Sequence, residues 1–203
     1  MLNRCPGSLA GTPTLKVKKC PECGNEVEVF SNDVKVECDK CGFIVYNDVE
    51  SCIQWCKYAK ECVGEQLYKK LKRYRVAFVG VGNAVRSVLA EALAKDINKS
   101  PKLGFVSAGT RPADFVEPAA VEALGAENII WHGKPKHLAR IGLADIFILM
   151  GPEVELPEEL KKARIIQWDI PNPAGKGFEE YRQVANILKE KITELIQEVE
   201  ENG

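Results

Sequence analysis

A short apolar run, a glycine-containing loop and an amphipathic stretch follow one another between residues 75 and 97. The apolar run that starts at Val76 is typical of a strand covered on both faces. Gly80 and Gly82 then let the backbone turn sharply, and beyond residue 84 apolar residues recur at helical spacing. A strand that leads through such a loop into a helix indicates an α/β fold, with the loop at the carboxyl end of the strand.

The loop is also suited to binding an anion. The unpaired amides of a first helical turn and the helix dipole attract oxyanions, and Arg86 in that turn could donate two hydrogen bonds to a phosphate. The alternative is an ordinary tight turn in which Arg86 is a solvated surface charge. A dinucleotide-binding fingerprint is not supported, because Val85 stands where the G-x-G-x-x-G pattern needs glycine or alanine.

Residues 80–87 read GVGNAVRS, which is C-x5-R-S with glycine in place of the cysteine. Further segments follow it in order: AEA at 90–92, VSAGT at 106–110, ADIFILM at 144–150 and WDIPNP at 168–173. Over about residues 73–203 the chain thus resembles the low-molecular-weight protein tyrosine phosphatases and their arsenate reductase relatives. The resemblance implies a set of phosphate-binding residues: Gly80, Val81, Gly82, Asn83, Ala84, Val85, Arg86, Ser87 and Asn172.

Two departures from the family pattern concern catalysis. The resemblance places the family's nucleophilic cysteine at Gly80 and its general-acid aspartate at Asn172. Glycine has no side chain that could form a covalent phospho-enzyme intermediate, and an amide cannot donate a proton as a carboxylic acid does. Asp169 lies three residues from Asn172 and could supply one of these roles at most. Loss of the thiolate also removes a charge that repels a bound anion by about 1–4 kcal/mol at about 4 Å.

We therefore expect a non-catalytic phosphatase-like protein that binds phosphate, or a phosphorylated small molecule or protein. One alternative is an active protein tyrosine phosphatase or arsenate reductase that uses a thiol from the N-terminal region, such as that of Cys5. Another is a vestigial pocket in a protein that acts only through its partners. His132 and His137 flank the expected pocket, where they could contact a ligand or serve as ordinary hydrogen-bonding groups.

All eight cysteines precede residue 63, and four of them form two CxxC pairs with fourteen residues between the pairs. These four are Cys20, Cys23, Cys38 and Cys41. The spacing, with short strand patterns between the pairs, fits a zinc ribbon in which four thiolates bind tetrahedral Zn²⁺. Disulfides are the alternative, but the first residues do not read as a signal peptide, so we expect a cytoplasmic protein with reduced thiols.

The other four cysteines are candidate ligands of a second metal: Cys5, Cys52, Cys56 and Cys62. Cys52 and Cys56 are four residues apart in an expected helical stretch over 51–72, so both can point at one ion. All-cysteine ligation is compatible with a second zinc or with an iron–sulfur cluster, and free or buried thiols are the alternative. The segment also resembles a small Cys-rich module attached to various archaeal and bacterial domains. We expect the metal-binding module of this chain to serve structure or association with a protein partner.

These patterns predict two domains. Residues 1–72 form a zinc ribbon plus a Cys-rich helical module, which is too short to fold easily without a metal. Residues 73–203 alternate strands and helices, which predicts a parallel four-stranded sheet with helices on both faces, as in the low-molecular-weight phosphatases. We expect strands near 74–80, 103–107, 144–149 and 164–168, and helices near 84–97, 116–124, 136–141, 153–161 and 178–200.

Charge and hydropathy exclude some classes of partner. The chain has 28 Lys and Arg against 29 Asp and Glu, and neither part is strongly basic, so binding to nucleic acid is not expected. No apolar stretch approaches 18 residues, so no membrane span is expected.

Overall fold

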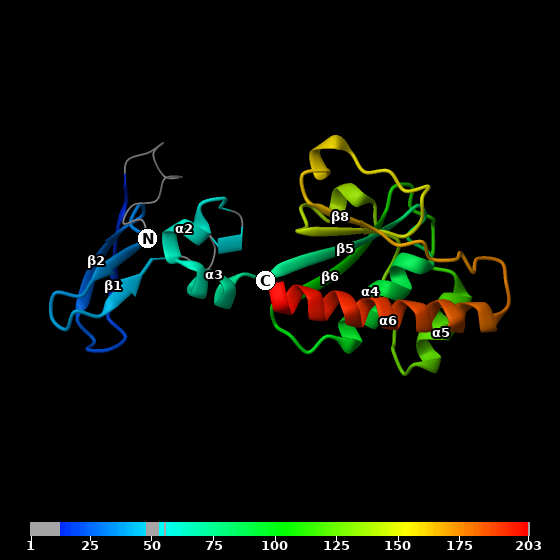
Figure 1. The fold of residues 1–203 in the computed structure, drawn as a ribbon, viewed down its shortest axis with the longest axis horizontal. Coiled ribbons are helices and arrows are strands. Elements are labelled where there is room, and N and C mark those ends of the chain that lie inside the picture. The colour runs from blue at the N-terminus through cyan, green and yellow to red at the C-terminus, as the bar shows by residue number, and fades with distance from the viewer. Residues whose placement is uncertain (1–12, 48–52, 55, 203) are drawn as a thin grey trace. The chain divides into compact units, whose positions relative to one another are not determined.

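The computed structural model describes residues 13–47, 53–54 and 56–202. The chain divides into two compact units, Met1–Lys72 and Arg73–Gly203, and each unit has a hydrophobic core of its own (Figure 1). Among the described residues, no helix is long and apolar enough to cross a membrane.

The first unit contains two short antiparallel hairpins. Strand β1 (Leu15–Lys19) pairs with β2 (Glu26–Phe30), and β3 (Lys35–Glu37) pairs with β4 (Ile44–Tyr46). The sequence pattern had indicated only β2 and β3. It missed β1 because LKVKK mixes charges with apolar side chains that are mostly exposed on this two-stranded sheet.

Each hairpin carries one CxxC pair in its turn. Gly24 has φ 70° and Gly42 has φ 73°, a conformation that favours glycine. Their amides donate to the carbonyl oxygens of Cys20 and Cys38 at 2.9 and 2.8 Å respectively, so the two turns have the same geometry.

A helical segment follows the hairpins. Helix α2 (Ala59–Val63) is separated from α3 (Glu65–Leu71) by Gly64, whose φ of 82° breaks the continuous stretch expected from the sequence. A small core joins this segment to the second hairpin region, and its buried members are Val34, Ile53, Ala59, Cys62 and Val63.

The second unit is built on a parallel sheet in the order β6-β5-β7-β8. The strands are β5 (Tyr74–Gly80), β6 (Leu103–Gly109), β7 (Ile146–Leu149) and β8 (Arg164–Gln167). The parallel four-stranded sheet predicted from the alternating pattern is therefore confirmed. Its central strand β5 is covered on both faces and ends at Gly80, where the glycine-containing loop begins.

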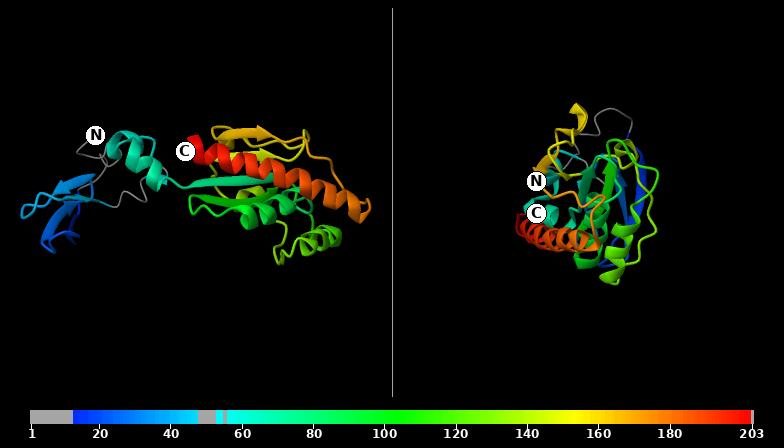
Figure 2. Two further views of the ribbon diagram at one scale, coloured as in Figure 1. Left: turned by 60° about the horizontal axis from the view of Figure 1, so that its bottom comes forward. Right: turned by 90° about the vertical axis from the view of Figure 1, so that its right-hand side faces the viewer.

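One face of this sheet packs against α4 (Arg86–Ile97), α5 (Pro118–Ala126) and α6 (Phe178–Asn202), as Figures 1 and 2 show. The other face is covered by segments that include two single-turn 3-10 helices, η2 (Leu138–Arg140) and η3 (Glu158–Leu160). Full helices near 136–141 and 153–161 were therefore wrong predictions. Gly142, with φ 66°, terminates the first segment, and Pro157 removes a backbone donor inside the second.

Helix α6 supplies a large part of the core through the apolar stripe seen in the sequence. Leu188 in the middle of this stripe is fully buried, whereas Leu143, on a connecting segment of the same unit, is 77% exposed. Replacing Leu188→Ala should lower the free energy of unfolding by about 2–5 kcal/mol, because it leaves a cavity. Leu143→Ala is the matched control and should change it by less than about 0.5 kcal/mol. Chemical denaturation of both variants measures the difference, and equal effects would contradict this view of the core.

Candidate functional site

The loop after β5 surrounds a pocket of about 370 Å³. All nine residues that the sequence resemblance implied line it, namely 80–87 and Asn172. The structure adds four further lining residues, which are Ala113, Glu117, Glu153 and Ala174. Binding of phosphate by these residues stays a prediction, but they are in one place.

The backbone of the loop is held with its carbonyl groups turned away from the pocket. The carbonyl oxygens of Gly80, Val81, Gly82 and Ala84 accept hydrogen bonds of 2.8–3.1 Å from amides in the segment 110–117. In a trans peptide the N–H points opposite to the C=O, so the amides that follow these carbonyls face the other way, toward the pocket. The loop thus presents a ring of hydrogen-bond donors of the kind that binds an oxyanion.

Strand β6 fixes the loop from beneath through Gly109. A Cβ atom at this position would lie 2.5 Å from the carbonyl oxygen of Val81 and 3.0 Å from the amide nitrogen of Asn83. Both contacts are with backbone, which cannot move aside without changing the loop. Only glycine therefore lets β6 approach the loop this closely.

Arg86 begins α4 and is held at the pocket by three partners. Its Nη1 donates to the carbonyl oxygens of Met150 and Ile170, and its Nη2 forms a 2.5 Å ion pair with Glu153. Arginine has five N–H donors, so these contacts leave two for a ligand. The hydrogen bond from Arg86 is the main reason that the pKa of Glu153 is lowered.

A second acidic residue that lines the pocket is Glu117. Its amide donates to the carbonyl oxygen of Ala84 at 3.0 Å, and its side chain accepts a hydrogen bond from the hydroxyl of Tyr181. Burial and this carboxylate together raise the pKa of Tyr181 to about 12, so the phenol stays a donor. The pocket therefore contains one cationic and two acidic side chains: Arg86, Glu117 and Glu153.

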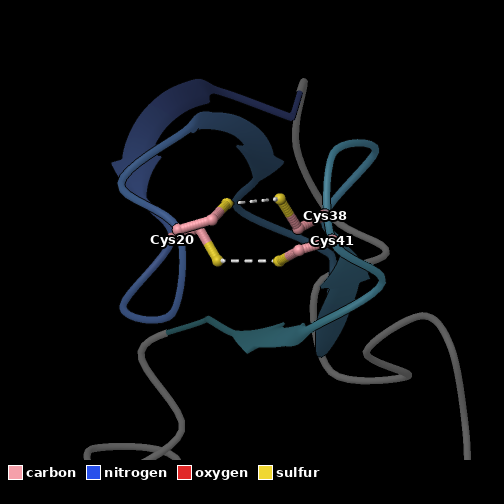
Figure 3. Close-up of side chains that lie close together, drawn as sticks. Cys20, Cys38 and Cys41 are labelled. Atoms are coloured by element: carbon pink, nitrogen blue, oxygen red, sulfur yellow. Dashed lines mark hydrogen bonds between the residues drawn. The ribbon is translucent and has the colours of Figure 1, made fainter.

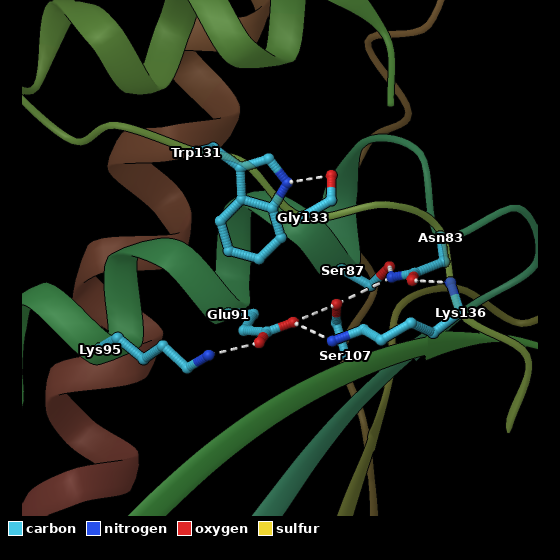
Figure 4. A network of polar contacts seen from close by, with 8 residues as sticks. All are labelled: Asn83, Ser87, Glu91, Lys95, Ser107, Trp131, Gly133 and Lys136. Atoms are coloured by element: carbon cyan, nitrogen blue, oxygen red, sulfur yellow. Dashed lines mark hydrogen bonds and ion pairs between the residues drawn. The ribbon is translucent and has the colours of Figure 1, made fainter. Parts of the chain in front are cut away.

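A buried hydrogen-bond network supports the loop from the core side (Figure 4). Asn83, which has φ 49°, donates to Ser87 at 3.1 Å and to Ser107 at 2.8 Å. Ser107 in turn donates to the carboxylate of Glu91, which is only 3% exposed. Burial raises the pKa of Glu91, but contacts with Lys95, Ser107 and Lys136 outweigh it, so the pKa is lowered overall.

The two histidines that the sequence placed beside the pocket, His132 and His137, are not among the residues that line it. Trp168 is 6% exposed and packs in the core against Phe78, and the Nδ1 atom of His137 accepts a hydrogen bond from the amide of Ala139. The sequence analysis missed Glu153 and Glu117. Glu153 comes shortly after β7, and the rule that ligands bind beyond the carboxyl ends of parallel strands could have identified it.

The four cysteines of the two CxxC pairs meet in the first unit, with Cys20, Cys38 and Cys41 labelled in Figure 3. Their sulfur atoms all lie within 4.8 Å of one another, and two of the separations are 3.6 and 3.7 Å. Sulfurs about 2.3 Å from a tetrahedral zinc are about 3.8 Å apart, and a disulfide would be much shorter. These cysteines could therefore hold one metal ion.

The ionisation of these thiols also favours a cation. The amide of Lys40 is the main cause that lowers the pKa of Cys38 to about 6. The amide of Phe43 lowers the pKa of Cys41, but the other three cysteines raise it to about 12 overall. Four thiolates so close together repel one another, and a bound divalent cation would remove that repulsion.

The second metal site cannot be located in the same way. Cys5 and Cys52 lie outside the described residues, while Cys56 is half-buried and Cys62 is buried in the small helical core. Within residues 13–47, 53–54 and 56–202, the Cys20–Cys41 quartet is the one group of three or more possible ligands close enough to share an ion.

The sheet order, the loop between β5 and α4, and the arginine at the end of this loop together define a phosphatase-type fold. Residues 75–203 match the model of the low molecular weight phosphotyrosine protein phosphatases, and the chain belongs to this family.

Individual relatives agree with this assignment. A glutaredoxin arsenate reductase of Synechocystis sp. is 28% identical over 130 residues, which are 62% of this chain and 98% of the relative. The structure of an arsenate reductase from Archaeoglobus fulgidus matches with 31% identity and a TM-score of 0.54, over 60% of this chain and 98% of that one. The arginine phosphatase YwlE from Geobacillus stearothermophilus matches with 25% identity and a TM-score of 0.58, over 64% and 94%.

The sulfur geometry predicts one firmly bound metal ion. Replacing Cys23→Ser should remove it, because three thiolates and a hydroxyl bind zinc much more weakly than four thiolates. Elemental analysis of both proteins, purified without added metal, should find one equivalent of metal fewer in the Cys23→Ser variant than in the wild type. The first unit should lose structure with it, since the free energy of metal binding is also folding free energy in small modules.

The half-buried Cys56 provides the comparison. Cys56→Ser should leave the metal of the quartet in place, so that any change in stoichiometry reports a second ion. Full metal content in the Cys23→Ser variant, or disulfides within the quartet of the wild-type protein, would contradict the assignment.

Proposed function

We propose that the Arg73–Gly203 unit binds an oxyanion, either phosphate or the phosphoryl group of a ligand, without the cysteine chemistry of its family. The observation that carries the proposal is the combination of a complete loop with a missing nucleophile. The loop amides and Arg86 face one pocket, while position 80 offers only a hydrogen atom and residues 73–203 contain no cysteine. Asn172, at the place where the family has its general acid, also lines the pocket.

The geometry around position 80 supports binding in a further way. A Cβ atom at Gly80 would lie 3.3 Å from the hydroxyl oxygen of Ser87, with no clash against backbone. This contact is tight, so the Ser87 side chain would have to shift by a few tenths of an ångström, but the loop backbone could stay as it is. An intact cradle without its nucleophile is suited to holding an anion.

Glu153 sets the strength of this binding. Its carboxylate is already paired with Arg86, and Glu117 adds a second negative charge at the pocket. A dianion therefore meets less positive charge than the loop alone would provide. We infer that affinity for inorganic phosphate is moderate, and that ligands with a cationic group near the phosphoryl group bind better than those without one.

For the first unit we propose a structural zinc ion in the Cys20–Cys41 quartet, with the module serving the folding of this unit or its association with a protein partner. We also propose a cytoplasmic protein, because thiolate ligation of this kind is maintained in a reducing compartment.

Titration with inorganic phosphate tests the binding proposal. Calorimetry on metal-replete protein should detect one site, and Arg86→Ala should abolish it. Glu153→Gln keeps a hydrogen-bond acceptor for Arg86 but removes a negative charge, so it should bind phosphate about tenfold more tightly.

Glu155→Gln is the matched control for the charge. It removes the same charge two residues away, outside the pocket lining, and should leave the affinity close to that of the wild type. No binding by the wild-type protein would refute the proposal. Weaker binding by the Glu153→Gln variant would show that the carboxylate assists the ligand.

Turnover of an aryl phosphate tests the non-catalytic part. We expect no hydrolysis above a buffer blank, because Gly80 provides no nucleophile and Asn172 no acidic proton. The double substitution Gly80→Cys with Asn172→Asp should produce measurable hydrolysis, since the loop accommodates a side chain at position 80.

The competing enzyme makes the opposite prediction. If a thiol of the N-terminal module acts as the nucleophile, the wild-type protein turns over substrate, and both Arg86→Ala and Cys5→Ser abolish the activity. That result would show that the protein is an active phosphatase or arsenate reductase, and the proposal of a non-catalytic binding protein would be wrong.

A further inference from the structure

The hydrogen-bond network beneath the loop has a fixed direction, because both of its ends are chemically unambiguous. At one end, the ionised carboxylate of Glu91 can only accept, so the hydroxyl of Ser107 donates to it. At the other end, the backbone N–H of Lys136 can only donate, and it donates to Oδ1 of Asn83 at 2.8 Å. The amide orientation of Asn83 is thereby determined, with its Nδ2 group facing the two serines.

This direction leaves Ser87 with a free proton. Ser107 has used its proton on Glu91, so it accepts from Asn83 at 2.8 Å, and Ser87 accepts from the same Nδ2 group at 3.1 Å. The Ser87 hydroxyl cannot donate to the Nδ2 group of Asn83, because that group is itself a donor. Among the described residues, no contact uses the Ser87 hydroxyl as a donor, although the residue is only 2% exposed. A buried O–H without an acceptor is costly, which suggests that a ligand supplies one.

The free proton lies beside the space that glycine leaves at position 80. The hydroxyl oxygen of Ser87 would be 3.3 Å from a Cβ atom at Gly80. Among the described residues other than 79–81, the one further atom within 4 Å is the Cβ of Ser87 itself. Ser87 and Gly80 both line the pocket. The floor of the pocket therefore combines a position without a side chain with one hydroxyl donor that lies close to it.

We propose that the Ser87 hydroxyl binds a terminal oxygen of a tetrahedral oxyanion, which occupies the volume above Gly80. This inference rests on the proposed function and specifies how the ligand is held. The remaining oxygens point toward the loop amides and Arg86, and the substituent of a phosphate monoester points out of the pocket. Glu91 is a positioning residue in this arrangement, because its carboxylate takes the proton of Ser107 and so makes Ser107 the acceptor for Asn83, which also contacts Ser87.

Phosphate calorimetry with floor variants tests the inference. Ser87→Ala should weaken binding of inorganic phosphate about tenfold, the effect expected for loss of a hydrogen bond to a charged group. Gly80→Ala should also weaken it, because the added methyl group fills the volume. Since both changes act on the same oxygen, the double variant should bind no more weakly than the weaker single one. Thr193→Ala, which removes an exposed hydroxyl on α6, is the control and should bind as the wild type does.

The role of Glu91 requires a double-mutant cycle. Glu91→Gln should weaken binding when Ser87 is present and have no effect in the Ser87→Ala background, whereas a general loss of structure would weaken both. Phenyl phosphate in place of inorganic phosphate should show the same dependence on Ser87.

The outcomes distinguish failure of the proposed function, phosphate binding by the loop, from failure of the Ser87 contact alone. If the wild-type protein does not bind phosphate, the proposed function itself is wrong. If the wild type binds and Arg86→Ala does not, but Ser87→Ala binds as tightly as the wild type, only the floor contact is overturned. Tighter binding by Gly80→Ala would likewise overturn it.

Discussion

The second unit depends on the hydrogen bonds that hold the loop carbonyls away from the pocket. Four backbone amides of the segment 110–117 satisfy them, so the donors on the other side of each peptide are directed at the pocket without any help from side chains. Asn83 adds the support from below, in a backbone conformation that asparagine tolerates better than most residues. The loop therefore keeps its backbone shape without a cysteine side chain at position 80.

The sequence was sufficient for the fold because its signals are local. The run from Val76 through Gly80 to the helical spacing beyond Arg86 identifies strand, loop and helix without reference to other segments. The CxxC spacing identified the quartet for the same reason. Helices near 136–141 and 153–161 were overpredicted, because Gly142 ends the first segment after one turn and Pro157 interrupts the second just before its single turn.

The charge balance of the pocket could not be predicted in this way. Glu153 and Glu117 reach the site from segments far from the loop in sequence, and their effect depends on a 2.5 Å contact with Arg86 and on the hydrogen bond from Tyr181. The position of Glu153 after β7 indicates the carboxyl edge of the sheet, but nothing in the spacing shows that it pairs with Arg86 or that Glu117 lines the same pocket. The direction of the Glu91–Ser87 network is equally invisible in sequence, because it follows from which backbone N–H reaches Asn83.

Gly109 has a consequence for comparing members of this fold. Its missing side chain makes room for the carbonyl oxygen of Val81, so a chain with any larger residue there has to build its loop differently. The requirement is the same whether or not a thiolate is present. Gly109 thus reports whether a chain can build this loop, and position 80 separately reports whether the loop carries a side chain that could act as a nucleophile.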